Sequence, residues 1–281
     1  MEYTPLSDEQ RRSFDEHGYL IVRDALDGAT IERLLEAGDR LMEGFRFEGY
    51  YAHRRDGLVQ ERALAELATH PTTVPLIVQL LGTNLHITNT ALIYKHPQRE
   101  PDAERNWHRD VGVHLDIGPA QVPRVGLKIG YCLTDFSTPD SGMTLMIPGS
   151  NSWHHPLPIP KGRIDPLTYE EPRLKPGDAF LFENRLFHAA GYNFGRQVAK
   201  IAMYGYHYRW IKPDFYLRHY NGRVQPDGDL LALLDDAGRQ LLGATSDSRG
   251  RESEHGIDWP LQEWATEHRL GLEQSPHTVE A

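Results

Sequence analysis

The pattern His-x-Asp occurs twice in the stretch "NWHRDVGVHLD" at 106–116, once as His108 and Asp110 and once as His114 and Asp116. Side chains two positions apart on an extended strand point to the same side, so either pair presents an imidazole and a carboxylate from one face. Both groups are metal ligands. Since Cys132 is the single cysteine, a metal here would be held by nitrogen and oxygen and not by thiolates. Spacing alone does not separate the two pairs.

A third ligand must come from a distant segment, because no short stretch of chain can occupy three positions on one face of a metal. The best candidate is His188 in "LFENRLFHAAGYN", at the end of an apolar strand and before a glycine-containing turn. Two histidines and one carboxylate leave three positions open, as in non-haem Fe(II) oxygenases. On spacing alone a second interpretation stays open, in which His188 is a core histidine and His108 and Asp110 are solvated loop residues.

The elements that must position these residues are predicted from apolar periodicity and from Pro and Gly turns. Strands are expected at 19–26, 85–97, 124–136, 143–150, 178–191 and 197–210. Helices are expected after Ser7, where Ser7 and Gln10 form a capping-box pattern, and at 29–45, 61–69, 73–82 and 229–243. The polar tail after Ala244 is expected to be loosely ordered.

Short strands separated by turns favour a β-sandwich or closed barrel over an alternating βαβ array. We expect a single domain over 1–281, with a helical part at about 1–82, a barrel core at about 83–211 and a helical, loosely ordered part at about 212–281.

Composition narrows the classes of partner. The net charge of -10 argues against nucleic acid, whose phosphates require a basic surface. The start "MEYTPLSDEQ" is polar and acidic, so we expect no secretory signal, and no run reaches the ~18 apolar residues of a membrane span. One cysteine fits a reducing compartment, and the expected location is the cytoplasm.

Several pieces of the chain, in order, resemble the phytanoyl-CoA dioxygenase-like family of Fe(II)/2-oxoglutarate oxygenases. They are "LSDEQRRSFDEHGYLIVRDAL", "LIYKHP", "NWHRD", "LTDFSTPDSGMTLMIPGSN", "LKPGDAFLF" and "FHAAGYN". They are similar to the family's first helix and strand, its Lys-x-Pro strand end, its Trp-His-x-Asp motif, its Pro-Gly-Ser hairpin, its Gly-Asp strand and its distal His-x-x-Gly-x-Asn turn. The resemblance covers about residues 6 to 205, and it rests on the order of the motifs.

The resemblance implies a fold, a chemistry and a choice between the two pairs. The fold is mainly β with flanking helices around a double-stranded β-helix, a jelly-roll, cupin-like barrel. The cofactors are Fe(II), 2-oxoglutarate and O₂, with ascorbate as reductant, and the products include succinate and CO₂. Because Trp107 precedes His108 whereas Val113 precedes His114, the implied metal ligands are His108, Asp110 and His188. His114 and Asp116 then become candidates for substrate contact.

The resemblance also implies an arginine for the far carboxylate of 2-oxoglutarate, ten or eleven residues after the distal histidine. Arg196, eight residues after His188, is the favoured candidate, and Lys200 on the following strand is the alternative. Lys95 in "YKHP" matches a family lysine beside the cosubstrate. Lys128 lies in the apolar segment "GLKIGY", where we expect an acidic partner or an anionic ligand, because an unpaired buried charge is costly.

The substrate is expected to be a small or mid-sized metabolite, for example in natural-product biosynthesis, contacted by Tyr51, Arg109, His114 and Trp153. Hydroxylation is the default outcome, with desaturation, epimerisation and cyclisation as alternatives. An aspartate at 110 disfavours halogenation, because related halogenases have a small residue there. Two rival functions stay open: a cupin-type metalloenzyme, either an isomerase or a ketoacid-independent oxygenase, and a non-catalytic barrel binding protein. A monomer or homodimer is expected.

Overall fold

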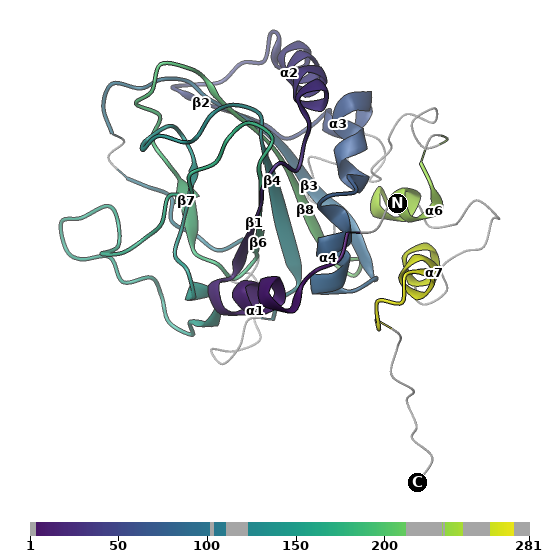
Figure 1. Cartoon of the computed structure of the whole chain (residues 1–281). Coiled ribbons are helices and arrows are strands. Elements are labelled where there is room, and N and C mark those ends of the chain that lie inside the picture. Colours follow the sequence, from purple (N-terminus) through teal and green to yellow (C-terminus); the bar gives the residue numbers. More distant parts are fainter. Residues whose placement is uncertain are drawn as a thin grey trace.

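A computed structural model describes residues 4–101, 104–110, 123–211, 232, 234–243 and 259–272 of the chain. Its centre is a six-stranded sheet in the order β1-β6-β4-β8-β3-β2, in which every neighbouring pair is antiparallel. The strands are β1 (Tyr19–Val22), β2 (Tyr51–Arg54), β3 (Leu85–Lys95), β4 (Gly126–Cys132), β6 (Ala179–Glu183) and β8 (Ala199–Tyr208). Figure 1 shows this major sheet with helices on one side and a smaller β-layer on the other.

The smaller layer pairs β5 (Thr144–Met146) with β7 (His188–Ala190). Isolated bridges extend it on both sides, since His108 pairs with His188 and Glu170 pairs with Met146. A core that includes Met146, Phe180 and Ile201 fills the space between the two layers. Mainly β architecture with flanking helices is therefore confirmed, although the described strands form two facing sheets and not a closed barrel.

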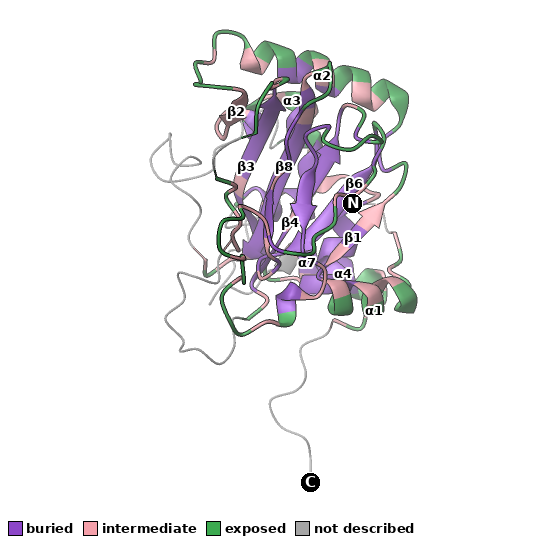
Figure 2. Cartoon of the chain, turned by 90° about the vertical axis from the view of Figure 1, so that its left-hand side faces the viewer, coloured by how far each residue is buried: buried purple, intermediate pink, exposed green. Residues whose placement is uncertain are grey.

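Helices cover the outer face of the major sheet. They are α1 (Asp8–His17), α2 (Gly28–Met42), α3 (Arg62–Glu66), α4 (Val74–Leu81), α6 (Asp236–Leu241) and α7 (Trp259–Glu267), with 3₁₀ turns at Leu58–Gln60, Leu67–Thr69 and Ser150–Ser152. Leu34 of α2 and Ile77 of α4 share one core with Leu92, Leu127 and Tyr204 of the sheet. Strand residues on both faces are therefore buried, as Figure 2 shows for β3, β4, β6 and β8.

The predicted first helix is confirmed in detail. Ser7 accepts a hydrogen bond from Gln10 N at 3.1 Å, and the Gln10 side chain accepts one from Ser7 N at 2.9 Å. This capping box satisfies two amide groups that the first turn would otherwise leave unpaired. Gly18 ends the helix with φ of 80° and leads directly into β1.

Three local predictions differ from the structure. The segment 178–191, expected as one strand, is divided into β6 and β7, which belong to different sheets. The strand β2 was not predicted from the short segment Tyr51–Arg54. The tail after Ala244, expected to be loosely ordered, contains the helix α7, whose Leu261 and Trp264 pack into the core.

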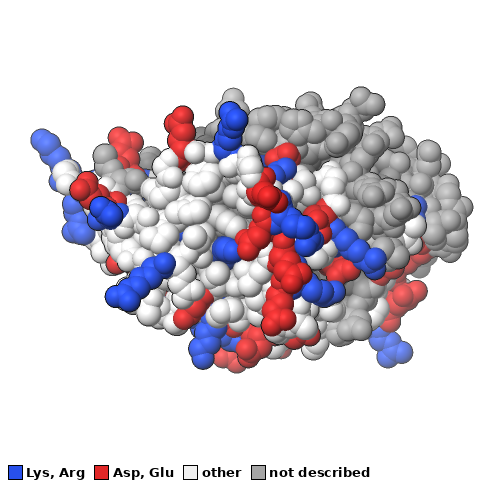
Figure 3. All heavy atoms as spheres, turned by 90° about the horizontal axis from the view of Figure 1, so that it is seen from above, with Lys and Arg blue, Asp and Glu red and all other residues white. Residues whose placement is uncertain are grey.

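The described surface carries both signs of charge. Figure 3 shows acidic and basic side chains intermingled on the face seen from above. Ion pairs among the described residues include Arg33 with Glu66 and Arg40 with Glu61. In the part of the chain that the structure describes, no helix has both the length and the apolarity to cross a membrane.

Candidate metal centre

Three side chains converge where the chain segment at residue 108 meets β7. Backbone hydrogen bonds of 3.0 Å run in both directions between His108 and His188. The centroids of the two rings are 4.3 Å apart. Asp110 Oδ1 lies 3.8 Å from Nε2 of His108 and 3.7 Å from Nε2 of His188. One ligand atom from each residue lies within 4.8 Å of the other two, so one ion can contact all three.

The backbone fixes which nitrogen of each imidazole faces the group. His108 Nδ1 lies 2.8 Å from Asn106 O, and His188 Nδ1 lies 3.0 Å from Leu186 O. A carbonyl oxygen only accepts, so the proton is assigned to Nδ1 and the lone pair to Nε2. Both Nε2 atoms therefore offer a lone pair on the side of Asp110, which is how metal-binding histidines are oriented.

The pKa values of His188 and Asp110 are both lowered, for different reasons, and both shifts favour the binding of a cation. Burial lowers the pKa of His188 to about 4, against the opposing effect of the Asp110 charge, so this imidazole is neutral at neutral pH. Burial alone would raise the pKa of Asp110. The charge of Lys128 and its hydrogen bond outweigh burial and hold the pKa of Asp110 well below its ordinary value.

The donor set fits a divalent transition metal. Asp110 Oδ2 is buried and has no hydrogen-bond partner among the described residues, a costly state for a carboxylate oxygen unless a ligand supplies one. Two imidazoles and one carboxylate on one side are the ligands of non-haem Fe(II) sites with open positions. The observed residues therefore fit the iron that the sequence resemblance implies.

Asp110 is held from the major sheet as well as from its own segment. Its backbone N donates to Asn184 O at 3.1 Å. The side-chain oxygen of Asn184 accepts hydrogen bonds from Val125 N and Gly126 N at 3.0 and 3.2 Å. Asn184 thus ends β6 and ties the turn before β7 to the start of β4. It is a positioning residue that the sequence alone did not reveal.

A buried ion pair supports the other side of His108. The Arg105 side chain is 6% exposed, and its Nε lies 2.7 Å from Asp165 Oδ1. Trp107 Nε1 donates to the same Asp165 oxygen at 2.8 Å. The Arg105 guanidinium also lies over the Tyr192 ring at 3.8 Å. Sequence reasoning missed both Arg105 and Asp165, although the indole N–H of a motif tryptophan requires an acceptor when it is buried.

Arg109, predicted to contact substrate, turns away from the metal-facing atoms. Its Nη2 donates to Ser150 O at 2.6 Å and to Trp153 O at 2.8 Å, and its guanidinium lies over the Phe187 ring at 4.1 Å. These contacts fasten the segment that carries Trp153. The Trp153 ring is half-buried and stacks on His155 with centroids 5.0 Å apart. His114 and Asp116 lie outside the described residues.

Lys95 is buried on the inner face of β3. It is 2% exposed, and its Nζ donates to Gly142 O at 2.6 Å and lies 5.7 Å from the ring centroid of Tyr51. Burial, followed by the charge of Arg105, lowers the pKa of Lys95 to about 7. An ammonium at this depth, close to a second cation, favours the binding of an anion.

The two other predicted cosubstrate residues lie elsewhere. Arg196 is exposed in the bend before β8. Lys200 lies on the outer face of the major sheet, where its Nζ contacts Asp39 Oδ1 of α2 at 2.6 Å and the Tyr94 ring at 4.7 Å. The position eleven residues after His188 is Ala199, which pairs with Lys95 across the sheet. Lys200 therefore points away from the inner face that holds Lys95, and Arg196 lies before the strand begins.

Lys128 has the acidic partner that its place in an apolar strand required. Its Nζ lies 2.6 Å from Asp110 Oδ1. The sequence left a choice between an acidic side chain and an anionic ligand, and the structure shows the candidate metal ligand itself as the partner.

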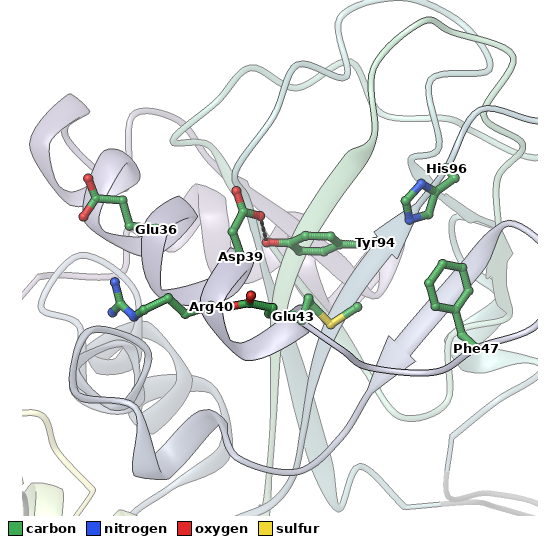
Figure 4. A pocket seen from close by; sticks show the side chains of 8 residues that line it. Glu36, Asp39, Arg40, Glu43, Phe47, Tyr94 and His96 are labelled. Carbon is green, nitrogen blue, oxygen red and sulfur yellow. Dashed lines mark hydrogen bonds between the residues drawn. The ribbon is translucent and has the colours of Figure 1, made fainter.

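A surface hollow lies on the opposite side of the major sheet from the His-Asp-His group. It is lined by Glu36, Asp39, Arg40, Met42, Glu43, Phe47, Tyr94 and His96. In Figure 4 the Tyr94 hydroxyl points to Asp39, and the hydrogen bond measures 2.7 Å. Phe47 and His96 stack on each other with ring centroids 5.1 Å apart. Asp39 is thus bound by both Tyr94 and Lys200, and Arg40 pairs with Glu61 outside the hollow.

The sequence profile of the phytanoyl-CoA dioxygenase (PhyH) family matches residues 14–201. Among curated proteins, dioxygenase trt7 of Aspergillus terreus is 24% identical over 200 residues, which cover 66% of this chain and 68% of that protein.

Two solved structures share the fold. HygX of Streptomyces hygroscopicus with nickel and 2-oxoglutarate bound has a TM-score of 0.62 at 17% identity, over 80% of this chain and 98% of that one. The epimerase SnoN in complex with Fe3+, alpha ketoglutarate and nogalamycin RO has a TM-score of 0.56 at 21% identity, over 71% of this chain and 82% of that one. At these identities the likeness establishes the fold alone.

Proposed function

Since the chain belongs to the phytanoyl-CoA dioxygenase family, and is thus a 2-oxoglutarate-dependent non-haem iron dioxygenase, we propose that it hydroxylates a small or mid-sized metabolite, with His108, Asp110 and His188 as its iron ligands. Family membership favours this function over a ketoacid-independent cupin enzyme or a binding protein. The main support for this proposal is that one ligand atom from each of the three residues lies within 4.8 Å of the other two. Bound Fe(II), together with 2-oxoglutarate and O₂, would supply the oxidising chemistry, with succinate and CO₂ as co-products.

Lys95 is the residue that we assign to the far carboxylate of 2-oxoglutarate. It occupies the inner face beside Ala199, where the family pattern would place an arginine, and no other predicted cosubstrate cation lies on that face. The space around it depends on small residues, because a Cβ at Gly142 would lie 2.8 Å from Ala199 Cβ and 3.4 Å from Lys95 Cδ. A lysine on the neighbouring strand thus replaces the arginine.

Tyr51 and Trp153 are the described candidates for substrate contact. Burial raises the pKa of Tyr51 to about 12, so its hydroxyl is a neutral donor beside Lys95. Hydroxylation is proposed over halogenation because Asp110 supplies a carboxylate where a halogenase needs an open position. A natural product as substrate is proposed because SnoN acts in nogalamycin biosynthesis. We also propose that the protein is located in the cytoplasm.

Turnover of the cosubstrate tests this proposal before any substrate is known. Purified protein with Fe(II), ascorbate and O₂ is expected to convert 2-oxoglutarate slowly to succinate, measured by mass spectrometry, and a library of hydroxylatable metabolites is expected to accelerate it. His108→Ala should abolish the conversion, whereas His268→Ala, whose imidazole binds Trp264 O far from the metal group, should retain it. Succinate formation that is equal in wild type and His108→Ala would overturn the proposal.

A further inference from the structure

Lys128 lies at the centre of the major sheet and faces the space between the two sheets. On β4 it is paired with Phe182 of β6 on one side and with Gly205 of β8 on the other. The Phe182 ring packs against the His188 ring with centroids 4.7 Å apart. Lys128 is therefore the neighbour of the residue that contacts the distal histidine, in a position that a solvated surface lysine does not occupy.

The contact with Asp110 makes the two carboxylate oxygens unequal. Lys128 Nζ lies 2.6 Å from Oδ1, while Oδ2 is buried with no hydrogen-bond partner in the part of the chain that the structure describes. Only 19% of the lysine side chain and 11% of the aspartate side chain are exposed, so water competes little for this contact. The ammonium thus restrains rotation of the carboxylate about its terminal bond.

We propose that Lys128 is a positioning residue that restrains Asp110 so that the carboxylate gives the metal one oxygen and not two. The inference rests on the proposed function, because it takes Asp110 as an iron ligand. A carboxylate that chelates through both oxygens takes two coordination positions. With two histidines bound as well, two of six positions would remain, and bidentate 2-oxoglutarate would fill both. Restraint by Lys128 keeps a third position open for O₂.

Loss of this hydrogen bond should therefore change coordination more than it changes metal capture. Lys128→Met has a side chain of similar length but removes both the donor and the charge. Metal binding is expected to persist, since the repulsion between the ammonium and the metal also disappears. 2-Oxoglutarate should still bind to the metal-loaded variant, because two positions remain for it. Its O₂-dependent turnover in the iron form should fall by about 10-fold, the lower end of the effects on activity seen when a partner of a metal ligand is removed.

The chain offers a closely matched control. Lys200 also lies 2.6 Å from an aspartate oxygen, that of Asp39, and its side chain is 18% exposed. That pair is on the outer face of the same sheet. Lys200→Met removes the same kind of contact without touching the metal group, and Lys128→Arg restores a cationic donor to Asp110.

The experiment loads wild type and the three variants with Co(II) without oxygen, records the visible ligand-field spectrum, and titrates 2-oxoglutarate by calorimetry. The proposal expects an altered spectrum in Lys128→Met, a spectrum close to wild type in Lys200→Met and Lys128→Arg, and 2-oxoglutarate binding in all four proteins. The spectrum reports coordination directly, so it separates positioning from a simple loss of charge. Should Lys128→Met fail to fold, Lys128→Gln, a neutral residue with a shorter donor, is tested in its place.

A wild-type spectrum in Lys128→Met would overturn this inference alone. Failure of the wild-type protein to bind Co(II) and 2-oxoglutarate would instead overturn the proposed function, and the inference with it. The two failures are therefore distinguishable in one set of titrations.

Discussion

Replacing Lys95 by methionine should weaken cosubstrate binding while making the fold more stable. The amine is 2% exposed, and its pKa is lowered from 10.5 to about 7. A shift of this size corresponds to about 5 kcal/mol against the charged form. Methionine avoids this cost in a side chain of similar shape, at the loss of one hydrogen bond to Gly142 O, which is worth about 1 kcal/mol.

The stability gain has a defined pH dependence. The folded protein binds fewer protons at Lys95 than the unfolded chain between pH 7 and 10.5, so wild-type stability rises with pH in this window. Lys95→Met is therefore expected to be more stable than wild type by a few kcal/mol at pH 7 and below, and the difference should disappear as pH approaches 10.5. Urea unfolding at several pH values measures it.

The loss of binding follows from the missing charge. A hydrogen bond to a charged group contributes about 1.5–3 kcal/mol, so the dissociation constant for 2-oxoglutarate should rise by about 10- to 150-fold. Calorimetry on metal-loaded protein gives this constant. An unchanged constant in a folded Lys95→Met variant would refute the assignment of Lys95 to the carboxylate. A large loss of stability would refute the view that the buried amine is kept for binding.

Two further predictions concern charge at the same centre. The affinity of wild type for 2-oxoglutarate should fall by up to about tenfold per pH unit above pH 7, because the anion needs the ammonium form of Lys95, whose pKa in the free protein is about 7. Calorimetry across pH 6–9 tests this prediction. An equal fall in the affinity of a Lys95→Arg variant would contradict it. Asp165→Ala should destabilise the fold by about 3–5 kcal/mol, because it removes the acidic partner of the buried Arg105 guanidinium. Denaturant unfolding measures this, and a decrease in the free energy of unfolding below about 0.5 kcal/mol would contradict it.

The sequence predicted the parts of the fold that local chemistry determines. The capping box at Ser7 and Gln10 needs only the spacing of two side chains, and the structure contains it. The two positions His108 and Asp110 share a side because strand geometry alternates. Such features depend on neighbours in the chain, and a single sequence therefore carries enough information.

Contacts between layers were not predictable in the same way. Both faces of β8 are apolar, because helices cover one face and the second sheet covers the other. The sequence of β8 has no alternation of apolar and polar residues that would show that Lys200 faces outward while Ala199 faces inward. The break between β6 and β7 was likewise hidden, because Asn184 ends the strand by bonding to Val125 and Gly126 of a distant segment.

The most direct test of the central claim is the stoichiometry of metal binding in variants of the two His-x-Asp pairs. Equilibrium dialysis with Fe(II) under anaerobic conditions should give one ion per wild-type chain and a strongly reduced value for His108→Ala and His188→Ala. His114→Ala should still bind one ion, because its pair is not among the proposed ligands. Retention of one tightly bound ion in His108→Ala, together with its loss in His114→Ala, would contradict the account.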